Sequence, residues 1–424
     1  MAQGGVIDYS IIVIDGGDRE VNSLTTVLDP QVLPWRIRPL IAVLSKIREG
    51  TLTLTTPEGY QLSFGDGSTP HADIQFHTWS ALKRIFRGGD VGLAECYRDG
   101  EVSCSDLSAL LRIALRNKTA LEKAFKRNRL LNIFYRMRHL LRPNSRRGSS
   151  RNIEAHYDLG NDFYGAWLDD TMTYSSARFQ DGIDGDLAQA QGHKYRRMIE
   201  MTGAKRGDSV LEIGCGWGGF AEHAAREGIE IEGVTLSPSQ LDYARDRIVD
   251  AGLEGGVSLH LKDYRALSGK YDHIVSIEML EAVGEAYWVC YFGKLNELLN
   301  MGGRAAIQTI VIRNDLFEAY RRRSDFIQQY IFPGGMLPSP ERLDDLASSN
   351  GFEIETTESF AADYAETLRR WRSTFLARRE QLLALGFDMA FARLWEFYLT
   401  YCEVGFDEGR IDVMQCALVK VREA

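Results

Sequence analysis

A glycine-rich segment is the strongest chemical signal in the sequence. It runs from Gly214 to Gly219, between the apolar run Ser209–Ile213 and a helical pattern. Glycine has no Cβ, so the backbone can turn sharply there and come close to a nucleotide at the N-terminus of the helix. The spacing also satisfies G-x-G-x-x-G, so a nicotinamide or flavin site is an alternative. The segment predicts a nucleotide-type cofactor and leaves its identity open.

The ends of the next two expected strands bear on that choice. Dinucleotide sites usually place an acid at the end of the second strand, whereas here that strand ends in Thr235-Leu236-Ser237 and the nearest acid, Glu232, lies inside it. The third strand ends in Asp263 and Tyr264, a carboxylate and a ring that can hydrogen-bond and stack on adenine. This set favours S-adenosylmethionine over NAD.

The elements that must position these residues follow an α/β pattern. Helical patterns alternate with short runs rich in β-branched residues after about residue 150, which indicates parallel strands with crossover helices. We therefore expect a doubly wound, Rossmann-like sheet that binds its ligand at the carboxyl ends of the strands. The expected strands are Ser209–Ile213, Glu230–Leu236, Val257–Leu261, His273–Ile277 and Arg304–Ile312.

A smaller α+β domain is expected before this sheet. The runs 7–14 and 51–64 are rich in β-branched and aromatic residues, and Pro57-Glu58-Gly59 predicts a hairpin turn. Turn-forming residues at 143–150 mark a break. We therefore expect an N-terminal domain at 1–150 and a cofactor-binding domain at 151–424.

Composition limits the class of protein. The chain has 424 residues, of which 44% are hydrophobic and 26% charged, which is typical of a folded enzyme with more than one core. The six cysteines show no disulfide or metal-site spacing, so we expect reduced thiols and no metal. Neither a signal peptide nor an apolar run of membrane-spanning length is visible, which predicts a cytoplasmic protein.

A basic segment stands out in a chain whose net charge is −9. Residues 116–151 contain twelve Lys or Arg and one acid, Glu122, and the apolar residues at 130, 134, 137 and 141 have helical spacing. The segment predicts a basic amphipathic helix, either packed on the next domain or attracted to anionic head groups at the inner face of the membrane. Nucleic acid is not expected, because no binding motif accompanies the charge.

Separated motifs give the sequence a family resemblance. It resembles the cyclopropane-fatty-acyl-phospholipid synthases, a family that includes the mycolic acid cyclopropane synthases and related lipid methyltransferases. The resemblance implies a class I methyltransferase fold, S-adenosylmethionine as cofactor, and an unsaturated phospholipid-bound acyl chain as substrate. The motifs are GLAECYRDG (92–100), HYDLGNDFY (156–164), MTYS (172–175), GCGWGG (214–219), TLSPSQ (235–240), DYR (263–265), YIFPGG (330–335) and ADY (362–364).

The same resemblance assigns the residues that bind the cofactor. They come from the Tyr-Ser pair, the glycine loop, and the ends of the second and third strands. They are Tyr174, Ser175, Gly214, Cys215, Gly216, Trp217, Gly218, Gly219, Thr235, Leu236, Ser237, Gln240, Asp263 and Tyr264.

Methyl transfer to an alkene needs close alignment, a stabilised cation and a base that removes a proton. Aromatic side chains are candidates for stabilising the cation. In the family, the base resembles a bicarbonate ion held by a carboxylate, a tyrosine, a histidine and a backbone group beside a cysteine. The carboxylate corresponds to Glu281 and the tyrosine to Tyr364. A late segment of the family also carries a cysteine, here Cys402, often designated an active-site residue.

This sequence departs from the family pattern at the base. Ser176 replaces the family's cysteine, and Gln308 replaces the histidine of His-Thr-Ile. Ala282 also replaces a histidine, and Glu278 stands where a small residue is usual. Gln308 can still hydrogen-bond an anion but cannot become cationic, and Glu278 adds negative charge, so bicarbonate binding is open to question.

We therefore expect a methyltransferase that acts on the double bond of an unsaturated acyl chain. A cyclopropane and a methyl- or methylene-branched chain are both open as products, and the altered base favours branching. The alternatives are a noncatalytic subunit that binds S-adenosylmethionine and lipid, and an NAD-dependent oxidoreductase. A homo-oligomer and a separate reductase or desaturase partner are also left open.

Overall fold

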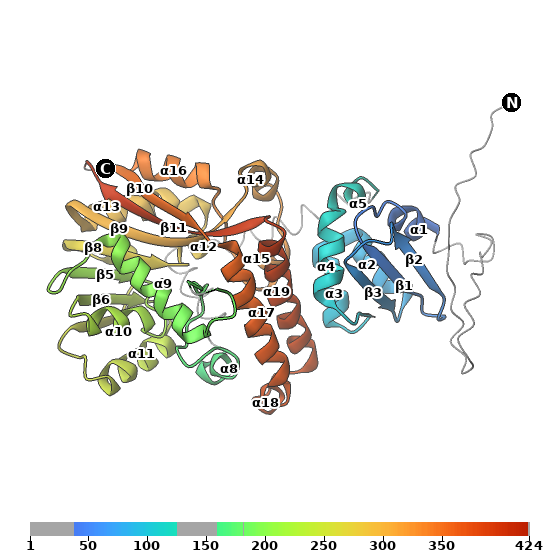
Figure 1. Cartoon of the computed structure of the whole chain (residues 1–424), viewed down its shortest axis with the longest axis horizontal. Helices are drawn as coiled ribbons and strands as arrows, with labels where there is room; N and C mark the ends of the chain where they lie inside the picture. Colours follow the sequence, from blue (N-terminus) through green and yellow to red (C-terminus); the bar gives the residue numbers. More distant parts are fainter. Residues whose placement is uncertain (1–37, 125–158, 181, 423–424) are drawn as a thin grey trace. The chain divides into compact units, whose positions relative to one another are not determined.

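The computed structural model describes residues 38–124, 159–180 and 182–422 (Figure 1). The chain divides into two compact units. The N-terminal unit comprises residues 1–132 and 388–404, and the C-terminal unit comprises residues 133–387 and 405–424. The predicted boundary near residue 150, the basic helix within 116–151 and the run 7–14 lie wholly or mainly outside the described residues, so they stay predictions.

The N-terminal unit contains a four-stranded sheet in the order β2-β1-β3-β4. Leu52 and Leu54 of β1 are buried, as expected for a strand with one face on a core. The predicted hairpin is confirmed: β1 and β2 are antiparallel and turn through residues 56–60, and the unit is α+β. Its elements are α1 (Arg38–Leu44), β1 (Thr51–Thr55), β2 (Gln61–Gly65), β3 (His71–Phe76), α2 (Trp79–Gly88), α3 (Asp90–Arg98), β4 (Val102–Ser103), α4 (Leu107–Arg116) and α5 (Lys118–Ala124).

The C-terminal unit contains a seven-stranded sheet in the order β10-β11-β9-β8-β5-β6-β7. Strands β7, β6, β5, β8 and β9 are parallel neighbours, and β11 pairs antiparallel with both β9 and β10. All five expected strands are present, so the predicted doubly wound sheet is confirmed. The strands are β5 (Ser209–Ile213), β6 (Glu230–Thr235), β7 (Val257–Leu261), β8 (Tyr271–Ile277), β9 (Leu299–Ile312), β10 (Phe352–Ser359) and β11 (Ile411–Lys420).

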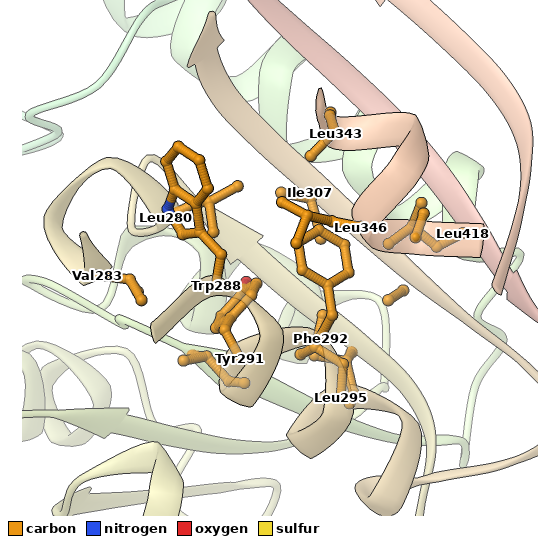
Figure 2. Close-up of a cluster of buried hydrophobic side chains, with 14 of the residues drawn as sticks. Leu280, Val283, Trp288, Tyr291, Phe292, Leu295, Ile307, Leu343, Leu346 and Leu418 are labelled. Carbon is orange, nitrogen blue, oxygen red and sulfur yellow. The ribbon is translucent and has the colours of Figure 1, made fainter. Parts of the chain in front are cut away.

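Helices cover both faces of this sheet (Figure 1). Successive strand residues point to opposite faces, so Val210 and Leu211 enter different cores. One core lies under α9 (Leu187–Thr202), α10 (Gly219–Arg226) and α11 (Pro238–Asp250). Figure 2 shows part of the other, where Phe292 of α13 (Trp288–Leu298) packs near Leu346 of α16 (Pro340–Ser349) and Trp288 lies near Leu280.

The remaining elements connect the strands or follow β10. None of the helices within residues 38–124, 159–180 and 182–422 combines the length and the apolar composition that crossing a bilayer requires. They are α8 (Asn161–Gly165), η1 (Tyr264–Ala266), α12 (Leu280–Val283), η2 (Glu285–Tyr287), α14 (Asn314–Arg321), α15 (Phe326–Tyr330), α17 (Ala361–Ala377), α18 (Arg379–Ala384) and α19 (Met389–Asp407).

The strand order reverses between β5 and β8. The chain runs outward from β5 through β6 to β7, and then returns to the other side of β5 for β8 and β9. In sheets of this kind, the crevice at the carboxyl ends of the strands beside this reversal is where ligands bind. The segments that follow Ile213 and Ile277 therefore mark the expected position of the site.

Candidate active site

The glycine loop follows β5 and leads into α10. Gly214, Gly216 and Gly218 have φ angles of 89°, 50° and 80°, which side chains with a Cβ rarely adopt. A Cβ on Gly218 would lie 3.1 Å from the Cβ of Ala244, so this glycine allows the loop to pack against α11. A Cβ on Gly216 would have no protein atom within 4 Å. The open side of Gly216 therefore suits a ligand that approaches the backbone.

A buried carboxylate lies just before this loop. Burial raises the pKa of Glu212 on β5 to about 8. Its Oε2 atom is buried and has no hydrogen-bond partner among the described residues. An acceptor left in this condition is costly unless a ligand satisfies it. The open glycine loop and this acceptor both fit S-adenosylmethionine, which carries positively charged groups.

The end of β6 is polar and buried. Ser237 caps α11, accepting a hydrogen bond of 3.3 Å from the backbone N–H of Gln240. The Oγ1 of Thr235 donates to Oε1 of Gln240 at 3.2 Å. Glu232 accepts a hydrogen bond of 2.7 Å from Tyr271 within the sheet, so it does not lie at the strand end where a ribose-binding acid is expected.

At the end of β7, Asp263 and Tyr264 both make contacts within the protein, in addition to any role in binding adenine. The Asp263 carboxylate accepts hydrogen bonds from the Arg265 guanidinium, the shortest being 2.6 Å, and from its backbone N–H at 2.9 Å. Tyr264 is buried in the core, with its ring 5.5 Å from that of Tyr291 in an edge-on arrangement. Asp263 is therefore fixed at the predicted place, while most of the Tyr264 ring packs inside the protein.

Tyr174 and Ser175 lie in the loop before α9. The Tyr174 ring lies 5.3 Å from that of Tyr164, which in turn lies 5.0 Å from the Trp217 ring of the glycine loop. The Oγ of Ser175 accepts a hydrogen bond of 2.5 Å from Lys194. Packing thus connects the Tyr-Ser pair to the glycine loop, although 38 residues lie between Ser175 and Gly214 in the sequence.

Glu278 is the centre of the second part of the site. It follows β8 directly, is half-buried, and has a φ of 50°. A non-glycine residue in this region is uncommon and persists where the surroundings fix it. Its backbone N–H donates to the carbonyl of Gln308 at 2.8 Å, which holds it against β9.

Three donors converge on the Glu278 carboxylate. The backbone N–H of Ser176 and the Nε2 of Gln308 both donate to its Oε1 at 2.8 Å. The hydroxyl of Tyr364 on α17 donates to its Oε2 at 2.6 Å. Burial raises the pKa of Glu278, and these three hydrogen bonds oppose that change. By the family resemblance, the bicarbonate nest has four members. Three of their positions, those of Ser176, Gln308 and Tyr364, thus hold the carboxylate of Glu278 in this structure.

Sequence reasoning singled out Glu278 only as a departure from the family. Its contacts could not be read from its neighbours, because Ser176 and Tyr364 are 102 and 86 positions away. The predicted residues Ser176, Gln308 and Tyr364 are brought together as expected for a common site. What they surround in this structure is a protein carboxylate.

Glu281, the predicted family carboxylate, lies one helical turn further on, in α12. Its Oε1 accepts a hydrogen bond from the backbone N–H of Ile310 on β9. Burial, and then the nearby charge of Glu278, raise the pKa of Glu281 to about 8. The raised pKa favours the protonated form of Glu281, which reduces the repulsion between the two neighbouring carboxyl groups.

A buried lysine that sequence reasoning missed provides the opposite charge. Lys194 on α9 is fully buried, and its ammonium donates to the Oε1 of Gln191 at 2.6 Å and to Ser175. Burial lowers its pKa, whereas Glu278 acts to raise it. A lysine on the apolar face of an amphipathic helix was the only local signal for this role. Lys194 thus donates a hydrogen bond to the Tyr-Ser loop and also interacts electrostatically with Glu278.

Cys402 belongs to a different compact unit from the other predicted catalytic residues. It is half-buried on α19, within the stretch 388–404 that belongs to the N-terminal unit. The adjacent Glu403 accepts a hydrogen bond of 3.3 Å from Ser108 of α4 in the same unit. The other predicted catalytic residues, Glu281, Tyr364, Gln308 and Ser176, all belong to the C-terminal unit.

Comparison with known proteins identifies the family. Residues 144–416 match the family described as mycolic acid cyclopropane synthetase. The chain belongs to this family. It is therefore an S-adenosylmethionine-dependent methyltransferase with a class I fold, which confirms the predicted enzyme class over the oxidoreductase and noncatalytic alternatives.

Individual relatives extend the likeness beyond the matched region. The chain is 40% identical over 408 residues to a tuberculostearic acid methyltransferase of Mycobacterium tuberculosis, covering 90% of this chain and 93% of the relative. It is 34% identical to the cyclopropane-fatty-acyl-phospholipid synthase of Escherichia coli K12, covering 82% of this chain and 88% of the relative.

Solved structures agree with the fold and the cofactor. A mycolic acid cyclopropane synthase complexed with SAH and CTAB has a TM-score of 0.60 and 30% identity, covering 64% of this chain and 98% of the other. A cyclopropane synthase from Mycobacterium tuberculosis has the same TM-score and coverage at 28% identity. These structures and the family support S-adenosylmethionine as the cofactor.

Proposed function

We propose that this enzyme methylates the double bond of an unsaturated, phospholipid-bound acyl chain, and that Glu278 removes the proton that completes the reaction. The observation that carries the proposal is the convergence of Ser176, Gln308 and Tyr364 on the Glu278 carboxylate. The residues that would bind a bicarbonate by family resemblance are instead engaged with, or adjacent to, a base built into the chain. Bicarbonate is therefore not needed in this proposal.

The hydrogen bonds leave the carboxylate able to act. An ionised carboxylate offers about four lone-pair positions. Two on Oε1 receive Ser176 and Gln308, and one on Oε2 receives Tyr364. The remaining position on Oε2 is the one we assign to the departing proton. Donors at the other three positions favour the ionised form against the effect of burial and fix the direction of the carboxylate.

The reaction has a simple balance. S-adenosylmethionine supplies a methyl group, whose carbon exchanges its bond to sulfur for a bond to one alkene carbon, and the other alkene carbon becomes a cation. Loss of one proton to the Glu278 carboxylate then leaves a neutral product. Ring closure gives a cyclopropane, whereas formation of a double bond beside the branch gives a branched chain.

We favour the branched product on two grounds. The identity with the tuberculostearic acid methyltransferase exceeds that with the cyclopropane-fatty-acyl-phospholipid synthase, over a larger share of the chain. In addition, Glu278 cannot move as a bound ion could, because its backbone and three donors fix its place. A saturated methyl branch would then require a separate reductase that acts on the unsaturated product.

An aromatic cluster supports the cationic intermediate in this proposal. The rings of Tyr174 and Trp371 lie 5.4 Å apart, and that of Trp167 lies 5.6 Å from Tyr174. Trp167 and Trp371 are almost fully buried, while Tyr174 is half-buried. The face of an aromatic ring attracts a cation more strongly when water is excluded. We assign the stabilising role to Tyr174, with the two tryptophans fixing its position.

Labelling the transferred carbon distinguishes the two products. We expect the enzyme, given S-adenosylmethionine with a ¹³C methyl group and vesicles of dioleoylphosphatidylglycerol, to place the label in a methyl branch or in a terminal =CH₂ group. Carbon-13 NMR of the extracted lipid separates both from a ring CH₂. Label found in a cyclopropane ring would reject the branched product. The absence of labelled acyl chains from several unsaturated phospholipids would reject the substrate class.

We also propose contact with the inner face of the membrane through the basic residues of 116–151. The charge pattern supports this role, because each basic residue near an anionic surface contributes about 1 kcal/mol of attraction. Charge reversal at Arg127, Arg129, Arg136 and Arg138 is expected to weaken binding to anionic vesicles at least about tenfold. Sedimentation with vesicles at low and high salt measures the effect. Unchanged binding in both tests would leave the segment a structural linker.

A further inference from the structure

A chain of hydrogen bonds runs from Arg178 to the carboxylate of Glu278. The Nη1 of Arg178 donates to the Oε1 of Gln415 at 3.0 Å, and the Nε2 of Gln415 donates to the Oε1 of Gln308 at 2.9 Å. The Nε2 of Gln308 then donates to the Oε1 of Glu278 at 2.8 Å. Three hydrogen bonds thus connect four side chains in one direction, from a guanidinium to a carboxylate.

The arginine fixes the direction of this chain. A guanidinium has donors and no acceptor, so Gln415 must turn its oxygen toward Arg178 and its NH₂ toward Gln308. Gln308 must then accept with its oxygen, which leaves its own NH₂ for Glu278. Reversal of either amide would place two donors or two acceptors against each other inside the protein, which is costly.

We propose that Arg178 and Gln415 are positioning residues, which orient the Gln308 amide so that it donates a hydrogen bond to the ionised Glu278. This inference rests on the proposed function, because it takes Glu278 as the base. Neither residue belongs to a motif that carries the family resemblance. Their role follows from the contacts alone.

The surroundings keep the chain in place. Gln415 and Gln308 are paired neighbours on β11 and β9, and both are fully buried. Arg178 is held by an ion pair with Glu358 of β10, which also binds Arg197 of α9. The buried amides of Gln415 and Gln308 therefore have little freedom to flip, that is, to rotate so that oxygen and nitrogen change places. Arg178 is therefore fixed by its ion pair, and the two glutamines are fixed by their places in the sheet.

Other groups besides this series of hydrogen bonds also affect the pKa of Glu278. Lys194 of α9 attracts the ionised form of Glu278, and Tyr364 of α17 donates to it. Glu281 of α12 interacts with it as a neighbouring carboxyl group. Loss of one donated hydrogen bond should therefore raise the pKa of Glu278 and leave the other influences in place.

The decisive variant is Gln415→Glu, which keeps the size of the side chain and its contact with Arg178. A glutamate there has no NH₂, so Gln308 must turn its own NH₂ toward it and present oxygen to Glu278. We expect the acidic limb of the kcat/KM profile to move up by about one pH unit, with about a tenfold loss of rate below that limb. The assay uses methyl-labelled S-adenosylmethionine and dioleoylphosphatidylglycerol vesicles.

Two further variants separate orientation from added charge. Gln415→Met introduces no charge and should move the limb in the same direction by a smaller amount. Arg178→Lys keeps a donor without an acceptor and should retain a profile close to that of the parent. Arg304→Met is the matched control, because Arg304 lies on β9 with Gln308 and, like Arg178, forms an ion pair, here with Glu355, but has no part in these hydrogen bonds.

The outcomes distinguish this inference from the proposed function. If Gln415→Glu and Gln415→Met both keep the parent's pH profile while Glu278→Gln is inactive, the positioning role is wrong and the base assignment stands. If Glu278→Gln itself keeps the activity and the acidic limb, the base assignment is wrong. A shift in both Gln415 variants, with Arg304→Met unchanged, would establish the role.

Discussion

Replacing Glu278 with Gln is expected to reduce kcat by a factor of about 10²–10⁴, the usual contribution of a general base. The variant cannot accept a proton at this position, and its NH₂ would face the NH₂ of Gln308 or the hydroxyl of Tyr364, which now donate to the carboxylate. Binding of S-adenosylmethionine should be nearly unchanged. The two measurements are labelled methyl transfer to phospholipid vesicles and calorimetric titration with the cofactor.

The matched control is Glu232→Gln in the same sheet. Glu232 also accepts a hydrogen bond from a tyrosine, at 2.7 Å from Tyr271, but it lies inside β6 and takes no part in the proposed reaction. Activity close to that of the parent is expected for this variant. Full activity of Glu278→Gln would show that another group accepts the proton, and Glu281 would then be the next candidate.

Thermal unfolding of Glu278→Gln is the test that separates a loss of activity from a loss of structure. Burial raises the pKa of Glu278 in the folded protein, so between its unfolded and folded pKa values the folded state binds more protons than the unfolded state. Stability from this group is thus present at low pH and lost as pH rises through that window. The variant lacks this titration, and its amide also faces the donors of Gln308 and Tyr364. The Tm of the parent should therefore rise relative to that of Glu278→Gln as the pH falls toward 4.5, the ordinary value for glutamate.

Replacing Gly216 with Val should weaken binding of S-adenosylmethionine by at least about 100-fold, because the branched side chain would enter the space left open beside the loop and would oppose its backbone angle. The φ of Gly216 is 50°, and an added Cβ would meet no protein atom within 4 Å. The expected damage is therefore to the ligand site and not to packing. Calorimetric titration with S-adenosylmethionine measures the loss.

Gly252→Val separates backbone strain from exclusion of the ligand. Gly252 has a φ of 68° and open space around its Cβ direction, but it lies after α11 and outside the predicted site. Both variants should lose similar stability, and only Gly216→Val should lose cofactor affinity. Near-parent affinity in folded Gly216→Val protein would show that the cofactor lies elsewhere.

Much of the fold was accessible from local sequence. The strands β5 and β7 begin and end at the predicted residues, and β6 ends one residue early. Runs of β-branched residues between helical patterns make such strands easy to recognise, because both faces of a parallel sheet are covered. The hairpin at 51–65 was equally clear, since its turn residues lie between two short apolar runs.

Other features depended on contacts that no local pattern contains. The polar Gln415 interrupts an apolar strand, but nothing around it shows that it faces Gln308 and Arg178. The part of α19 that carries Cys402 belongs to the N-terminal unit, although it follows the cofactor-binding sequence by more than a hundred residues. Helical periodicity predicts an amphipathic helix and does not state which domain covers its apolar face.

The sequence by itself determined the doubly wound sheet and predicted the cofactor and several members of the site, because glycine turns and strand periodicity are short-range properties of the chain. Only the tertiary structure showed that Ser176, Gln308 and Tyr364 donate to Glu278. Only the strand order places β9, α17 and the segment after Tyr174 around the end of β8, where their donors meet the carboxylate of Glu278. A hydrogen bond depends on distance and direction within a few tenths of an ångström, and residues about a hundred positions apart acquire that geometry only when the whole sheet is assembled.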